Sequence, residues 1–438
     1  MAEAKTTDAN TEEATVAETS VAKPNAAGSN MTEEVTVAET SADQAPVRKK
    51  MSRGKKVALW IVGVIVGLVV VVLLGFNIYM RTTYASFFDE AQDEFAIPGT
   101  NAGFICQDLD YYDEGGCWFF SGYASGDGSS PLYRRDADGD ATEFFAQLPD
   151  GSPYTGHGSG ITTSSDYAYL TCDDGYLVFN AADLVAVEAG GEVRAIDQVD
   201  LELTPVFMNI ENDVLFVGTF HLLPNYAAPD EHHLTAPDGT EQAGIMLAYL
   251  PAQLEPDEAG KYGFSTKAAA AYSLPDKVQG MCVFPDGDIV LSTSYGFATS
   301  HLLTYRIDTT DAFMATLAAN LAREAERETG VAPVVSGTGK EAGTTKDIRD
   351  AYEEAKTTGV VDLEIPYTFF VDGRSVPLFF LDSTCQISDV EAPPMIEGIE
   401  YHDGRVWISE ESASNKYIFG KLYGAGDVYS LSDQAFSD

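Results

Sequence analysis

The segment VQGMCVFPDGDIVLSTSYG (278–296) contains the pattern on which the fold depends. An apolar run interrupted by Gln and Gly comes first, a PDG turn follows, and a second run rich in β-branched residues completes the segment. This order is typical of two antiparallel strands joined by a tight turn. The segment therefore predicts a β-hairpin.

The same order recurs along the second half and the middle of the chain. Its other first strands are FICQDLDY from Phe104, HGSGITTS from His157, PVFMNIEN from Pro205 and IEGIEYHDG from Ile396. Repeats of this kind, each supplying one small sheet, predict an all-β fold, a β-propeller with five blades over residues 103–438. Six blades stay open, because the segment VDLEIPYTFFVDGRSVPLFFLDS (361–383) is long enough for two more strands.

One insertion into this pattern has helical periodicity. Residues 311–328, DAFMATLAANLAREAERE, and the later DIRDAYEEAK predict a helical insertion at about 311–358. A second insertion, HLLPNYAAPDEHHLTAPDGTEQ (221–242), is polar and rich in turn residues. We expect it to be a long loop that caps one end of the domain.

Residues 57–79 form an apolar run of 23 residues without a charge. As a helix this run is roughly 34 Å long, which is enough to cross a bilayer core. Six basic residues precede it closely and only Arg81 follows at once, so we expect a single-pass protein of the cell membrane with a cytoplasmic amino terminus. A cleaved signal peptide is the competing interpretation; the length of the apolar run and the lack of an A-x-A site argue against it.

The segments on either side of the apolar run differ in composition. Residues 1–56 have a basic end and few large apolar side chains, and they contain the near-repeat TEEATVAETS and TEEVTVAETS; they predict a disordered cytoplasmic tail. Residues 80–102 are expected to be a juxtamembrane stalk. The extracytoplasmic domain follows from 103.

Charge limits the partners of the outer domain. Beyond residue 80 the chain has 18 basic and 59 acidic residues. Such an excess of negative charge repels nucleic acids, so no nucleic-acid partner is expected. The expected partners are the lipid bilayer, through residues 57–79, and an unidentified ligand or protein outside the cell.

Three shorter motifs have competing interpretations. Cys106 and Cys117 lie in one expected hairpin, so they form either a disulfide or two buried thiols. GHGSG (156–160) has its Ser at the fourth position, unlike a nucleophile elbow, and is interpreted as part of a first strand. DADGD (136–140) has its Gly at the fourth position and lacks the distal Glu of a calcium loop, which favours a solvated turn.

At VQGMCVFPDGDIVLSTSYG and PPMIEGIEYHDGRVWISEESASNKY the chain resembles secreted and membrane-anchored β-propeller proteins of actinobacteria that have no assigned activity. It is more distantly similar to the gluconolactonase, paraoxonase and strictosidine-synthase propellers. The latter resemblance implies a calcium ion in the central channel, bound by an acidic residue of an EG pair. Here that residue is Glu397, and it is the one metal-ligand candidate.

The other candidates for a ligand site or channel lining lie on first strands or on the capping loop. Gln107, Asp108, Asn209 and Gln279 belong to first strands, and oxygen atoms converging from several blades suit a hard cation. His157 begins a first strand, and His232 and His233 lie on the capping loop, where they are expected to approach the same end of the channel. Gln stands where the resemblance implies acids, so no cofactor is assigned, and calcium remains an open alternative.

The sequence favours a binding or scaffolding module at the bacterial cell envelope over an enzyme. Rigid blades with variable end loops suit recognition of a ligand or protein. The alternative is a calcium-dependent hydrolase of the lactonase or arylesterase type, as the more distant resemblance implies. No catalytic residues are assigned.

Overall fold

The computed structural model describes residues 52–124, 128–252, 260–307 and 367–436, and the backbone of the short strands β20 (Val334–Val335) and β21 (Val360–Val361). The helical insertion expected at about 311–358 and the tail before residue 52 lie outside the described residues. The chain divides into two units, Met1–Val62 and Gly63–Asp438. Every contact discussed below lies within the second unit.

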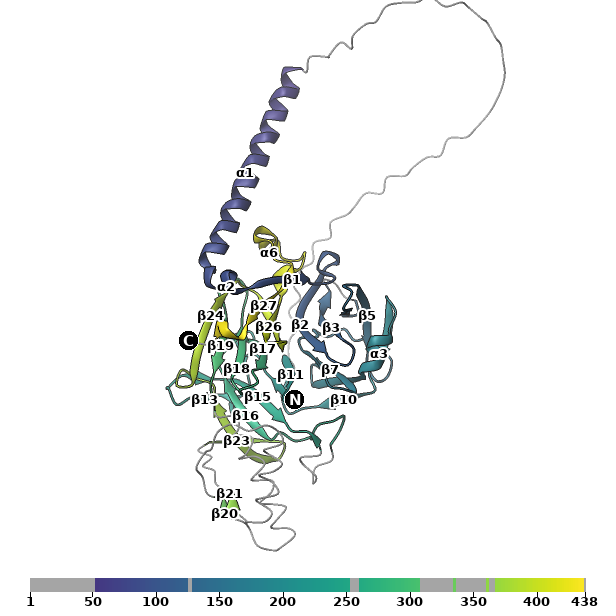
Figure 1. Cartoon of the computed structure of the whole chain (residues 1–438), viewed down its shortest axis with the longest axis vertical. Helices are drawn as coiled ribbons and strands as arrows, with labels where there is room; N and C mark the ends of the chain where they lie inside the picture. Colours follow the sequence, from purple (N-terminus) through teal and green to yellow (C-terminus); the bar gives the residue numbers. More distant parts are fainter. Residues whose placement is uncertain are drawn as a thin grey trace, which may run out of the picture. The chain divides into compact units, whose positions relative to one another are not determined.

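Five sheets form the blades of a β-propeller (Figure 1). Their innermost strands are those the sequence repeats predict, and they contact one another in a closed ring. In ring order these strands are β2 (Phe104–Tyr112), β6 (Ile161–Thr163), β11 (Phe207–Glu211), β17 (Val278–Val283) and β25 (Ile396–His402). The prediction of an all-β, five-bladed propeller is therefore confirmed.

The first two blades continue outward with antiparallel strands. Blade 1 adds β3 (Cys117–Ala124), β4 (Pro131–Arg135), β5 (Ala141–Gln147) and, parallel to β5, β9 (Gly191–Arg194). Blade 2 adds β7 (Tyr167–Cys172), β8 (Gly175–Asn180) and β10 (Asp197–Asp200), with helix α3 (Ala181–Ala186) after β8.

Blades 3 and 4 are interleaved along the chain. Blade 3 contains β11, β12 (Val214–Gly218), β15 (Gly244–Tyr249) and β16 (Ala270–Leu274), and blade 4 contains β17, β18 (Ile289–Thr293), β19 (Ser300–Tyr305) and β24 (Gln386–Ala392). Between β19 and β24 the chain returns to the outer edge of blade 3 as β22 (Thr368–Val371) and β23 (Arg374–Phe380). Strands β22 and β23 of segment 361–383 thus extend blade 3, and the alternative of a sixth blade is wrong.

Blade 5 is completed from the other end of the domain. Its strands are β25, β26 (Arg405–Glu410), β27 (Asp427–Ser432) and, at the outer edge, β1 (Gln92–Ala96). Pairing an amino-terminal strand with the last blade closes the ring through backbone hydrogen bonds. Residues 80–102, expected to be a stalk, are therefore part of the propeller, and Met80 and Phe87 lie in its core. The sequence did not indicate β1 because it is short and largely exposed.

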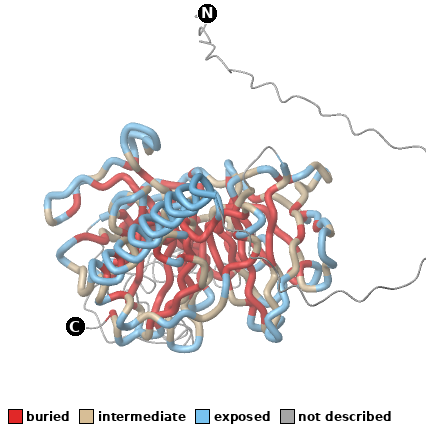
Figure 2. Tube along the Cα trace, turned by 90° about the horizontal axis from the view of Figure 1, so that it is seen from above, coloured by how far each residue is buried: buried red, intermediate tan, exposed pale blue. Residues whose placement is uncertain are grey.

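The remaining elements are short apart from α1. They are α2 (Ala85–Glu90), α6 (Ile418–Tyr423), η1 (Thr100–Ala102), η2 (Asp230–His232), η4 (Glu411–Ala413), η5 (Asp433–Phe436), β13 (Leu234–Thr235) and β14 (Glu241–Gln242). The buried residues, drawn in red in Figure 2, belong mainly to the strands of the blades. The faces of adjacent blades pack through aromatic and aliphatic residues, among them Phe119, Phe144, Tyr169 and Tyr272, each fully buried.

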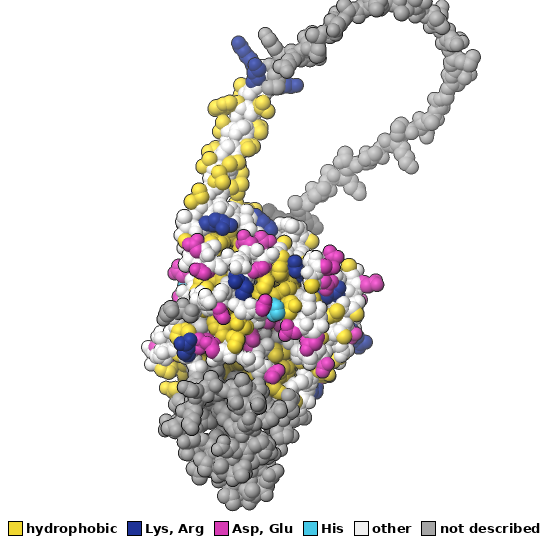
Figure 3. All heavy atoms as spheres, viewed as in Figure 1, with side chains coloured by type: hydrophobic (Ala, Val, Ile, Leu, Met, Phe, Trp, Pro, Cys, Tyr) yellow, Lys and Arg dark blue, Asp and Glu magenta, His cyan; other side chains and the backbone are white. Residues whose placement is uncertain are grey.

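Helix α1 (Arg53–Thr83) is, among the described residues, the one helix long and apolar enough to cross a membrane. Its apolar side chains are exposed along its length, and basic side chains gather at its start (Figure 3). The helix exceeds the predicted 57–79 run by four residues at each end, because helical backbone continues into the charged flanks.

Candidate functional site

A cavity of about 630 Å³ lies where the five inner strands begin. Every blade contributes to its wall, directly from an inner strand or from the segment just before one. The residues that represent the five blades in chain order are Gln107, His157, Pro205, Gln279 and Glu397. The repeats that build the fold therefore also build this cavity.

β-Bulges in three inner strands direct polar side chains into the cavity. The pairing register shifts between Cys106 and Asp108 in β2, between Val278 and Gly280 in β17, and between Ile396 and Ile399 in β25. The residues in these bulges include Gln107, Gln279 and Glu397, and all three line the cavity. A bulge adds a residue to one strand and redirects its side chain, and bulges are common beside functional sites.

Asp108 and Gly398, which directly follow the lining residues Gln107 and Glu397, lie against each other. Asp108 Oδ2 accepts a hydrogen bond from the backbone N–H of Ile161 at 2.8 Å, and Oδ1 accepts one from Leu109 at 2.9 Å. A Cβ at position 398 would overlap the Asp108 carboxylate. Glycine is therefore required in the EG pair because the carboxylate of another blade fills the channel there.

Glu397 is a buried acid of this site. Its side chain is only 3% exposed. Burial first, and then the negative charges of Glu411 and Asp108, raise the pKa of Glu397 well above its usual value. A protonated carboxyl group offers one O–H donor and one carbonyl acceptor to a ligand.

One wall of the cavity is a polar and aromatic network. The rings of Tyr123 and His157 lie 4.1 Å apart between centroids. The hydroxyls of Tyr123 and Tyr417 donate to Glu411 Oε1 at 3.1 and 2.6 Å, and Lys416 Nζ donates to the Tyr123 hydroxyl at 2.9 Å. Desolvation and then Lys416 lower the pKa of His157, which favours neutral imidazole.

The opposite wall is aromatic. Phe220, Tyr226 and Tyr295 all line the cavity and form one cluster, with ring centroids 5.3 Å apart for Phe220–Tyr226 and 6.3 Å apart for the other two pairs. These side chains come from the segments after β12 and β18. The cavity therefore presents flat apolar rings opposite hydrogen-bonding groups, which is the usual composition of a small-molecule site.

The structure brings only some of the candidate residues together. His157, Gln279 and Glu397 line the cavity, with Gln107 beside them. Asn209 lies deeper, where its amide donates to Met281 O at 3.0 Å and to Glu400 Oε2 at 2.8 Å. The loop histidines do not line the cavity: His232 is buried against Phe369, and His233 lies 5.3 Å from the ring of His221. Their loop folds along blade 3, so the expected approach of His232 and His233 to His157 does not occur.

Three further acids lie in the channel and were not named from the sequence. Asp110 accepts a hydrogen bond from the Thr163 hydroxyl, and Glu211 accepts one from the Val283 N–H. Burial is the main cause that raises the pKa of Asp110 to about 7, of Glu211 to about 8, and of Glu400 well above its usual value. Asp110 and Glu211 each follow a named residue by two positions, a spacing that puts both side chains on one face of a strand.

No group of three or more His, Cys, Asp or Glu side chains is placed to hold a metal ion among the residues that the structure describes. Glu397 lies beside amides and aromatic rings in the cavity. Calcium binding at Glu397 therefore stays a prediction.

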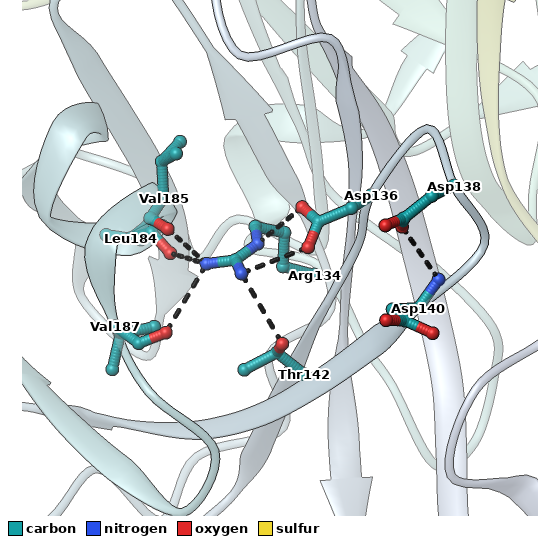
Figure 4. A network of polar contacts seen from close by, with 8 residues as sticks. All are labelled: Arg134, Asp136, Asp138, Asp140, Thr142, Leu184, Val185 and Val187. Atoms are coloured by element: carbon teal, nitrogen blue, oxygen red, sulfur yellow. Dashed lines mark hydrogen bonds and ion pairs between the residues drawn. The ribbon is translucent and has the colours of Figure 1, made fainter.

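The motifs with competing interpretations have structural explanations. The expectation that GHGSG is part of a first strand is wrong, because β6 begins at Ile161; Gly158 and Ser159 instead line the cavity before the strand. DADGD is the turn between β4 and β5. Arg134 pairs with Asp136 at 2.7 Å and donates to the backbone carbonyls of residues 184, 185 and 187, as Figure 4 shows.

All five cysteines are free thiols, so Cys106 and Cys117 do not form a disulfide. The pairing of β2 and β3 places Cys106 opposite Gly122 and Cys117 opposite Tyr112.

Comparison with known proteins gives likeness in fold alone. No family model matches the sequence. No curated protein matches it either. Among solved structures, the chain is similar to the PQQ-bound form of an aldose sugar dehydrogenase from Streptomyces coelicolor, with 14% identity over 78% of this chain and 98% of that one and a TM-score of 0.38. It is also similar to the Dos1 propeller, with 6% identity over 75% and 74% of the two chains and a TM-score of 0.29.

Proposed function

We propose that this protein is a membrane-tethered binding module of the cell envelope whose ligand occupies the cavity at the start of the inner strands. The observation that carries the proposal is the convergence of Gln107, Gln279 and Glu397, each in a strand bulge, on one cavity lined by all five blades. A scaffold that positions polar groups this closely is preorganised for a ligand.

The tether is α1. Its exposed apolar side chains have no protein partner to cover them in the described residues, and a bilayer would cover them. Arg48, Lys49, Lys50, Arg53, Lys55 and Lys56 lie before the apolar run. The excess of basic residues on this side favours retention of the amino terminus in the cytoplasm and export of the propeller.

Ligand binding to the full chain in phosphatidylcholine nanodiscs tests the proposal. Neutral mono- and disaccharides, amines and short carboxylates are added singly while thermal unfolding is followed, because a ligand of the folded state raises stability by about 2.7 kcal/mol at 100 times its Kd. A ligand of the cavity stabilises the parent protein and the Glu400→Gln control, and loses its effect in Glu397→Leu, which removes both hydrogen-bonding atoms of that side chain. Equal stabilisation of all three proteins would show that the ligand binds elsewhere.

The second candidate function is a calcium-dependent hydrolase of lactones or esters. One observation favours it: Glu397, the residue that matches the EG pair of the lactonase-like propellers, lines the cavity. In that function the calcium ion would polarise the carbonyl group of the substrate. Native mass spectrometry with calcium and with chelator separates the two functions, because the hydrolase requires one bound ion that Glu397→Gln abolishes.

A further inference from the structure

Exposed apolar side chains of the propeller gather around the mouth of the cavity. Among the described residues after α1, eight large hydrophobic side chains are exposed. Five of them lie on two loops and at the start of α6 and are called here the apolar rim: Leu223, Tyr226, Tyr295, Phe297 and Ile418. Phe297 and Ile418 are 69% and 75% exposed. Exposed apolar groups concentrated in one place mark an interaction surface.

The segments of the apolar rim are also cavity walls. Tyr226 and Tyr295 belong to both, and Phe297 and Ile418 directly follow the lining residues Gly296 and Tyr417. Whatever covers the apolar rim therefore lies at the mouth of the cavity and controls which molecules reach it.

The end of α1 packs on two of these segments. The Phe76 and Phe419 rings lie 5.5 Å apart, and the Phe297 and Phe419 rings lie 5.0 Å apart. The side-chain amide of Asn77 donates to the Tyr423 carbonyl at 3.0 Å, which attaches α1 to α6. Phe76 and Asn77 lie within the last four residues of the apolar run that ends at 79.

This packing fixes the level of the apolar rim relative to a membrane. If α1 spans a bilayer, the hydrocarbon region ends near residue 79, at the level where Phe76 touches Phe419. Phe297 and Ile418 are then at the boundary between hydrocarbon and head groups, and aromatic side chains such as Tyr295 and Phe297 are favoured there. The apolar rim is continuous with the apolar surface of the helix.

We propose that the apolar rim rests on the bilayer in which α1 is embedded, and that the cavity receives the uncharged, hydroxylated head group of a membrane-embedded amphiphile, a glycolipid. This inference rests on the proposed function, since it names the source and the chemistry of the ligand. The acyl chains stay in the bilayer beneath the apolar rim, and the head group enters the cavity.

The lining of the cavity suits such a head group. The amides of Gln107 and Gln279 can both donate and accept hydrogen bonds, as sugar hydroxyls require. Burial raises the pKa of Glu397, which favours a carboxyl group with the same two capacities. Lys416 donates to Tyr123, and its ammonium lies 4.9 Å from the centroid of that ring and 5.0 Å from that of Tyr417. Asp173 and Glu411 add negative charge to the same lining, which disfavours a phosphate head group.

Docking on the bilayer is tested first, with the full chain in phosphatidylcholine vesicles. Phe297→Trp and Ile418→Trp are made in a Trp60→Phe background, and lipids brominated in the acyl chains quench tryptophans that reach them. The matched control is Phe370→Trp, at a side chain that is 70% exposed on β22, away from the apolar rim. Docking predicts loss of most of the added emission at 297 and 418 and little loss at 370.

The ligand is tested in nanodiscs of phosphatidylcholine with and without monoglycosyl diacylglycerol, and separately with the soluble methyl glycoside. Glycolipid is expected to raise the unfolding temperature of the full chain. Glu397→Leu, which removes both hydrogen-bonding atoms of the side chain, is expected to remove the shift. The double variant Phe297→Ser/Ile418→Ser should weaken glycolipid binding roughly tenfold, equivalent to 1.4 kcal/mol, and leave binding of the methyl glycoside unchanged.

The outcomes separate this inference from the proposed function. Equal quenching at 297, 418 and 370 overturns bilayer docking, although binding of a soluble ligand in the cavity would still support the proposed function. Strong quenching at 297 and 418 without any effect of the sugar head group overturns the glycolipid assignment. Quenching with a glycolipid shift that depends on Glu397 supports the inference.

Discussion

The carboxylate of Asp108 from blade 1 lies against Gly398 of blade 5, in the space that a Cβ at position 398 would need. The same carboxylate holds the start of blade 2 through the N–H of Ile161. Three blades therefore meet at one acid that directly follows the lining residue Gln107, so the fold and the site depend on neighbouring residues.

Gly398→Ala is expected to destabilise the propeller. The added methyl group overlaps a buried carboxylate that is held by two backbone donors, and such overpacking costs about 1–3 kcal/mol. Urea unfolding of the full chain in detergent measures the loss. The matched control is Gly426→Ala, where a Cβ meets nothing within 4 Å; a loss of equal size in the control would contradict the steric explanation.

Stability is expected to fall as the pH rises from 5 to 8. Burial raises the pKa of Asp110 to about 7 and of Glu211 to about 8, so the folded state retains protons that the unfolded chain releases near pH 4. For each of these carboxyl groups, the free energy of unfolding falls by up to about 1.4 kcal/mol for every pH unit between its pKa in the unfolded chain and its pKa in the folded protein. Glu211→Gln should flatten the pH dependence, whereas the exposed control Glu188→Gln should leave it unchanged. A stability that rises across this range would contradict the prediction.

Phe95→Ala tests the closure of the ring by β1. Phe95 packs against Trp118, Phe120 and Trp407, and the Arg135 guanidinium lies 3.8 Å from the centroid of its ring. Because the ring is half-buried, we expect a loss of about 1–3 kcal/mol in the free energy of unfolding. Phe370→Ala removes an exposed ring and should change stability by less than about 0.5 kcal/mol. Similar values for both variants would mean that β1 does not close blade 5.

The topology is tested on intact cells. An epitope at the carboxyl terminus should be digested by protease added outside, and one at the amino terminus should become accessible only after lysis. Replacing the six basic residues before α1 by Gln should give a mixed orientation, since the positive-inside bias is lost. Release of the protein as a shorter soluble form would instead identify the apolar run as a cleaved signal peptide.

The five thiols are expected to remain reduced. Cys106 and Cys282 have no exposed surface, and burial is the main cause that raises the pKa of both. Alkylation of the native protein should therefore leave these two unmodified, and alkylation after unfolding should modify all five. An unreduced mass lower by two hydrogens would reveal a disulfide that the structure does not contain.

Several residues of the candidate site could be predicted from the sequence. Gln107 and Gln279 were named because they are polar residues in apolar first strands, and Glu397 was named because it matches the EG pair of the lactonase-like propellers. His157 was named for its place at the start of an expected first strand. Asp110 and Glu211 follow the two-residue periodicity of β2 and β11, so the same logic extends to them.

Other parts depend on contacts between distant segments. Tyr417 and Tyr123 are far apart in sequence and meet at Glu411 because blades 1 and 5 are neighbours in the ring. His232 and His233 were misplaced for the same reason, because a long loop can cover any of several surfaces and its own sequence does not specify which one. The apolar rim is recognisable only once its three segments lie around one mouth.

The sequence by itself determined the five first strands, the apolar helix and the acidic character of the domain, because each depends on local periodicity or on composition. The tertiary structure alone decided that β1 closes blade 5 and that β22 and β23 extend blade 3, since those pairings join strands far apart along the chain. It also decided that the mouth of the cavity lies beside the end of α1. The physical reason is that hydrogen-bonded edges and packed side chains select partners by shape across the whole fold, and no stretch of sequence contains that information alone.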